Sequence, residues 1–144
     1  MTEGWRPGTV ALTVADVTDL IPNHKVVVVH FWARWNGVDR QFASVLDAIR
    51  PQFESRITFR SADVDDPELA SSCRECEVVN VPALGCFVDG RRVKTIVGSR
   101  PTSVLRAEFA VLLGEVVVPD PALRQTPPHD SLLGRLWSLV RRYS

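Results

Sequence analysis

A run of β-branched and aromatic residues constrains the fold of this chain most. Lys25 is followed by four valines and then by His30, Phe31 and Trp32, with no Asp, Glu, Lys or Arg among them. Such residues favour β-strands, and a strand without polar alternation is typical of one that is buried on both faces. We therefore expect residues 25–32 to form the central strand of a sheet with helices on both sides.

Helix and strand signals alternate along the rest of the first 113 residues. Apolar residues recur at helical spacing after Gly37, Asp66 before Pro67 is typical of a helix start, and Asp89-Gly90 predicts a hairpin. The expected strands cover 9–14, 25–32, 57–64, 83–88 and 92–97, and the expected helices cover 13–21, 37–53, 66–76 and 99–113. This order predicts an α/β fold with a central mixed β-sheet of about five strands, flanked by helices.

Length and charge exclude several classes of protein. The 144 residues suit one domain, and the 17 basic side chains are balanced by 17 acidic ones, which gives no reason to expect nucleic-acid binding. No segment approaches the roughly 20 apolar residues that span a bilayer, and no apolar leader follows the N-terminus. We expect a cytoplasmic protein that binds no membrane, metal or cofactor.

A change in composition divides the chain near Gly114. Residues 8–114 form the expected domain, and residues 115–129 are rich in proline, which predicts an extended linker. Residues 130–143 predict a C-terminal amphipathic helix, with apolar side chains that include Trp137 on one side. A helix this short must dock on something to be stable. We expect the helix to dock on its own domain first, on a partner protein second and on an anionic membrane surface third.

The segment from Val29 to Arg40 resembles the active-site strand and turn of the thioredoxin family. The family pattern is Val-Asp-Phe-Trp-Ala-x-Trp-Cys-Gly-Pro-Cys-Lys, and this chain has VHFWARWNGVDR at the same twelve positions. Val81-Pro82 resembles the family's cis-proline loop, and Asp63-Val64-Asp65 also has a counterpart in the family. The resemblance covers roughly residues 9–113 and implies a thioredoxin-like fold.

The same resemblance implies that the usual redox site is degenerate. Asn36 and Asp39 stand where the family has its two cysteines, Val38 replaces the motif proline, and His30 replaces a buried aspartate. Neither an amide nor a carboxylate can exchange disulfides. We therefore expect no catalytic residues at Asn36 and Asp39, no thioredoxin-type disulfide reductase activity, and two helix-capping side chains in a redox-inactive site.

These departures favour a non-catalytic protein-binding or scaffold module. In the family, substrate backbone pairs with the cis-proline loop through main-chain hydrogen bonds, which need no cysteine. We expect another protein or a peptide segment to bind in this groove, or else at the C-terminal helix. The expected binding residues are Trp35, Asn36, Gly37, Val38, Val81 and Pro82.

A second pair of cysteines leaves an alternative open. Cys73 and Cys76 have CxxC spacing and fall at the end of the predicted third helix, where the helix dipole raises the pKa of a thiol. If the helix frays before Cys76, the pair could close and make the chain an atypical thiol-disulfide oxidoreductase or redox sensor. Two cysteines are too few for a structural zinc site, and Cys86 is expected to be a buried hydrophobe.

Overall fold

The computed structural model describes residues 5–115. The expected C-terminal helix and, apart from Glu115, the expected linker lie outside the described residues and stay predictions. The elements are α1 (Val14–Asp19), β1 (Val26–Trp32), α2 (Gly37–Ile49), η1 (Arg50–Gln52), β2 (Thr58–Asp63), η2 (Pro67–Leu69), α3 (Ala70–Glu75), β3 (Ala83–Val88), β4 (Arg91–Val97) and α4 (Thr102–Leu112).

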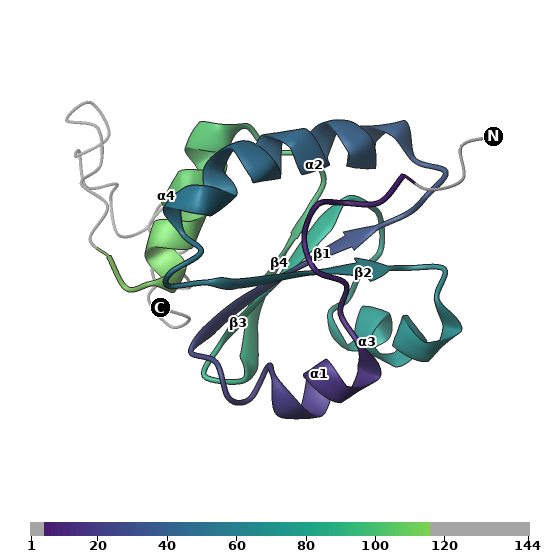
Figure 1. Cartoon of the computed structure of the whole chain (residues 1–144), viewed down its shortest axis with the longest axis horizontal. Coiled ribbons are helices and arrows are strands. Elements are labelled where there is room, and N and C mark those ends of the chain that lie inside the picture. The colour runs from purple at the N-terminus through teal and green to yellow at the C-terminus, as the bar shows by residue number, and fades with distance from the viewer. Residues whose placement is uncertain (1–4, 116–144) are drawn as a thin grey trace, which may run out of the picture.

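The four strands form one mixed sheet in the order β2-β1-β3-β4. β1 runs parallel to β2 and antiparallel to β3, and β3 is antiparallel to β4. All seven residues of β1 are buried, as the valine run predicts. Helices α2 and α4 cover one face of the sheet, and α1 and α3 cover the other (Figure 1).

Alternate residues of β1 belong to two different hydrophobic cores. Val26 and Val28 pack with residues of α2 and α4, among them Phe42 and Phe109. Val27, Val29 and Phe31 pack on the opposite face with residues such as Leu12, Leu69 and Cys76. Because successive side chains of a strand point to opposite faces, a single unbroken apolar run supplies both cores.

The expected first strand does not form, so the sheet has four strands and not about five. Ala11 makes one isolated parallel bridge with Ser61 of β2, and the backbone then turns away. Thr13 ends the pairing because it caps α1. Its side chain accepts from the Asp16 N–H, and the Asp16 carboxylate accepts from the Thr13 N–H, which completes a capping box.

The expected turns are confirmed. Asp89 and Gly90 adopt φ values of 51° and 82° in the β3–β4 hairpin, and the Val81-Pro82 peptide bond is cis. Asp66 caps η2 through a hydrogen bond from the Glu68 N–H, as its position before a proline predicts. Among the described residues, no helix is long and apolar enough to cross a membrane.

Replacing Phe109 tests the core beneath α2 and α4. Its ring is fully buried and contacts the rings of Phe53 and Phe59 edge to face, with centroids 5.4 and 5.6 Å away. Phe109→Ala should lower the free energy of unfolding by about 3–5 kcal/mol, measured by urea denaturation. Val104→Ala, on the exposed side of the same helix, should change it by less than about 1 kcal/mol; equal losses would contradict this packing.

Candidate functional site

The turn between β1 and α2 carries the residues singled out by the sequence. Asn36 is the N-cap of α2, and its Oδ1 accepts a hydrogen bond of 2.9 Å from the Val38 N–H. This confirms the expected capping role of Asn36. Asp39 lies in the first turn of the same helix but has a different role, because its side chain points into the protein and is fully buried.

Asp39 connects the helix to the strand before it. Its Oδ2 accepts a hydrogen bond of 3.0 Å from the Ala33 N–H, and its Oδ1 lies 3.4 Å from Nε2 of His30. His30 is also buried, against the ring of Phe42 at a centroid distance of 5.4 Å. The approach of Oδ1 to Nε2 does not have the geometry of a hydrogen bond, and both ring nitrogens of His30 and Oδ1 of Asp39 are buried without a hydrogen-bond partner. Buried polar groups without partners are costly, so this pair departs from ordinary core packing.

Removing the Asp39 carboxylate should therefore destabilise the domain. Asp39→Ala leaves the buried Ala33 N–H without an acceptor, which should lower the free energy of unfolding by about 1–3 kcal/mol in urea denaturation. Asp39→Asn keeps an acceptor oxygen and should lose less. The control is Asp47→Ala on the same helix, whose ion pair with Arg50 is partly exposed and should be worth about 1 kcal/mol or less. A larger loss of unfolding free energy for Asp47→Ala than for Asp39→Ala would contradict the role of Asp39 in connecting α2 to β1.

The structure brings the turn and the cis-proline loop together, but it occupies the groups that a peptide would use. The Asn36 Nδ2 donates a hydrogen bond of 3.0 Å to the Val81 carbonyl. The Val81 N–H donates one of 2.9 Å to the Asn80 side chain. A peptide that docks as a strand would compete with these two hydrogen bonds, and the Val81 carbonyl keeps a second lone pair. The expected main-chain binding mode stays a prediction.

Trp35 is the most exposed aromatic side chain beside this turn, at 70% exposure. Its indole N–H donates a hydrogen bond of 3.1 Å to the Asp65 carboxylate in the loop after β2. Val38, also exposed, follows on α2. Sequence reasoning named Trp35 as a binding residue but missed its partner Asp65, because the two are 30 positions apart in the chain.

The second pair of cysteines lies at the C-terminal end of α3. The Glu77 N–H bonds to the Arg74 carbonyl and the Val78 N–H to the Cys73 carbonyl, each at 3.0 Å. Glu77 adopts a left-handed φ of 56°, and Cys76 is the C-cap. This is a Schellman motif with a glutamate where glycine is usual. The helix thus ends in a regular cap at Cys76, whose N–H still bonds to the Ser72 carbonyl at 3.0 Å, and the fraying that the alternative hypothesis requires is not present in this conformation.

The three cysteines are free thiols that differ in access to solvent. Burial raises the pKa of Cys73, which is half-buried, with Arg74 opposing this shift and Asp63 and Asp66 adding to it. Burial raises the pKa of Cys76 to about 11 and that of Cys86, inside β3, to about 12. Cys86 is confirmed as a buried hydrophobe. Because the thiolate is the reactive form, Cys73 is the most available nucleophile of the three.

Contacts from the sheet fix the position of Cys76. The Thr95 hydroxyl donates a hydrogen bond of 2.6 Å to the Cys76 carbonyl. A Cβ atom at Gly85 would come within 2.9 Å of the Phe31 ring and 3.4 Å of the Cys76 sulfur. A glycine in β3 therefore lets α3 approach the sheet this closely. Sequence reasoning missed Gly85, although a glycine inside an apolar strand signals close packing.

Comparisons with known proteins agree on one family. The Thioredoxin family model matches residues 8–110. The thioredoxin of Mycobacterium tuberculosis strain H37Rv is 37% identical over 112 residues, which cover 76% of this chain and 94% of the relative. The thioredoxin of Alicyclobacillus acidocaldarius is 34% identical over 106 residues, which cover 73% of this chain and 98% of the relative. The crystal structure of oxidized mitochondrial thioredoxin 3 from Saccharomyces cerevisiae matches with a TM-score of 0.61 and 26% identity, covering 69% of this chain and 92% of that one.

These relatives correct the main functional expectation. A redox-inactive, non-catalytic scaffold is wrong as the leading interpretation, because the similarity to proteins named thioredoxin extends over the whole domain. The expectation depended on four replaced residues, His30, Asn36, Val38 and Asp39, and equated the absence of thiols at one turn with the absence of redox chemistry. The alternative, a thiol function at Cys73 and Cys76, fits the findings better.

Proposed function

Because the chain belongs to the thioredoxin family, we propose that it is a thiol-disulfide redox protein whose dithiol is Cys73 and Cys76. We infer that Asn36-Gly37-Val38-Asp39 occupies the position of the family's CxxC motif, which has no sulfur here. Thiol chemistry then needs one of the chain's three cysteines. The observation that carries the proposal is that two free thiols with CxxC spacing lie at a helix end, one of them partly exposed.

The exchange would use the two thiols in sequence. The Cys73 thiolate attacks a substrate disulfide, so that a mixed disulfide forms, the substrate S–S bond breaks, and the first leaving thiolate takes up a proton. The Cys76 thiolate then attacks the Cys73 sulfur, which closes the Cys73–Cys76 disulfide and releases the second substrate thiol. The substrate gains two electrons and the chain loses two. A second dithiol, or an excess of a low-molecular-weight thiol, reverses the oxidation.

The end of α3 must rearrange during this reaction. Cys76 is 3% exposed, and hydrogen bonds hold both cysteine carbonyls, from Val78 to Cys73 and from Thr95 to Cys76. A disulfide requires the two Cβ atoms to approach within about 4.5 Å. Since the helix already ends at Cys76, opening its last turn would expose the second thiol without unfolding the sheet.

We infer that the substrate is a disulfide of another protein or peptide. Cys73 and the exposed Trp35 both lie beside the loop after β2: Asp63 and Asp66 act on the Cys73 thiol, and Asp65 accepts the Trp35 hydrogen bond. An exposed aromatic side chain gives a partner an apolar contact. Three free thiols suit a reducing compartment, which favours the cytoplasm.

Serine variants test the assignment of the dithiol. The intact chain should accelerate insulin reduction by dithiothreitol, and Cys73→Ser should abolish the acceleration because the attacking thiol is gone. Cys76→Ser should accumulate a mixed disulfide, detectable by mass spectrometry. Cys86→Ala, the matched control at the third thiol, should retain the activity. An intact chain no faster than dithiothreitol alone, or an active Cys73→Ser variant, would show that this dithiol is not the redox centre.

The reaction should also depend on pH in a defined direction. Burial raises the pKa of Cys73 above its usual 9.0, so its thiolate fraction is low at neutral pH. Alkylation of Cys73 by iodoacetamide should rise by about tenfold per pH unit up to pH 9 and continue to rise beyond it. The measurement uses the Cys86→Ala variant, with free cysteine as the reference. A rate that levels off below pH 9 would contradict the buried environment of this thiol.

A further inference from the structure

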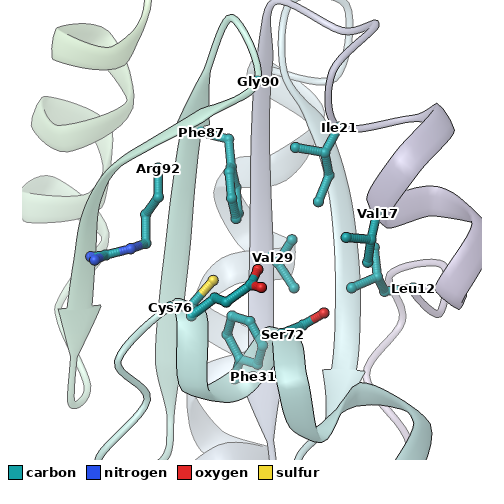
Figure 2. Close-up of a pocket in the computed structure, with 11 residues that line it drawn as sticks. Leu12, Val17, Ile21, Val29, Phe31, Ser72, Cys76, Phe87, Gly90 and Arg92 are labelled. Carbon is teal, nitrogen blue, oxygen red and sulfur yellow. The ribbon is translucent and has the colours of Figure 1, made fainter.

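A cavity of about 250 Å³ lies between α1, α3 and the sheet, and Figure 2 shows the side chains that line it. Val29 and Phe31 of β1 form part of its floor, and Val17 and Ile21 form part of its wall on the α1 side. The Cys76 sulfur lies among these apolar side chains (Figure 2). Apolar side chains and one buried thiol therefore line the same cavity.

The cavity is partly open to solvent, and other hollows on the described surface have larger volumes. Its apolar lining and the Cys76 sulfur, not its size, set it apart. Here α1 and α3 span only six residues each, and the hollow between them has a floor that is itself almost fully buried, with Val29 and Phe31 at 0% and 1% exposure. An engineered cavity of about 150 Å³ lined by Leu, Ile and Phe binds benzene in another protein. A space of about 250 Å³ is thus large enough for an aromatic ring with a substituent.

The charges at the rim select against an ionic occupant. Glu75 lines the cavity and would repel an anion. Arg92 also lines it, but its guanidinium bonds to the Thr95 hydroxyl at 3.2 Å, lies 3.6 Å from the Glu77 carboxylate and points away from the cavity in Figure 2. A cation would lose its hydration against an apolar floor. The lining therefore suits a neutral, apolar molecule.

We propose that this cavity is a binding site for a small neutral apolar molecule, of the size of a substituted benzene, that lies against the Cys76 thiol when bound. Trp35 and Cys73 do not line this site, and its existence does not depend on the proposed redox function. If that function holds, an occupant would slow closure of the Cys73–Cys76 disulfide by keeping Cys76 in its buried position.

Labelling of Cys76 with matched reagents tests the site. N-ethylmaleimide is neutral, whereas its N-carboxymethyl analogue differs by one carboxylate. Trypsin cleaves after Arg74 and separates the two cysteines, so Cys73 serves as the internal reference in the same digest. The ratio of Cys76 to Cys73 labelling should be at least tenfold higher with the neutral reagent. Saturating toluene should lower Cys76 labelling severalfold and leave Cys73 labelling unchanged.

Two phenylalanine variants locate the effect in the cavity. Val17→Phe adds a ring inside the cavity, whereas Val14→Phe adds the same ring on an exposed position of the same helix. Val17→Phe should suppress both the Cys76 labelling by N-ethylmaleimide and the toluene effect. Val14→Phe should leave both within twofold of their values in the unmodified chain. If Val17→Phe does not fold, toluene competition on the unmodified chain decides. Equal labelling ratios for the two reagents, or no toluene effect, would overturn the site. The redox activity of the serine variants tests only the proposed function and does not affect the evidence for this binding site.

Discussion

Burial of β1 on both faces is the constraint on which the rest of this structure depends. Seven consecutive side chains leave water, so helices must cover both sides of the sheet. α2 and α4 meet one set of alternate residues, and α1 and α3 meet the other (Figure 1). The position of each candidate site follows, because the turn after β1 and the end of α3 are both held against this strand.

A single polar residue in this strand determines the character of the turn that follows. His30 is buried, and Asp39 turns inward from α2 to meet it. Asn36 caps the helix and also binds the Val81 carbonyl of the cis-proline loop. Asn36 and the Oδ2 of Asp39 thus find hydrogen-bond partners within the chain, whereas the His30 ring nitrogens and the Oδ1 of Asp39 do not. Since these last groups are buried, the turn has few free hydrogen-bonding groups for a substrate.

The same burial governs the thiols on the opposite face. Cys76 packs against Phe31 and Gly85, and its desolvation keeps the thiol protonated at neutral pH. Cys73, nearer the surface, is less shielded. A redox pair built in this way depends on local opening of a helix end, which links its chemistry to the stability of α3. The cavity beside Cys76 adds a second route by which small molecules could influence that end.

The sequence by itself determined the central strand, the α2 amphipathic helix, the Asp89-Gly90 hairpin and the caps at Thr13, Asn36 and Asp66, because each depends on neighbours within a few residues. It also indicated the family through the segment around Trp35. Only the tertiary structure decided that the N-terminal segment forms a single bridge, that Asp39 faces His30, and that Gly85 admits Cys76 against the sheet. Those outcomes depend on residues brought together by folding, and their packing cannot be inferred from local spacing.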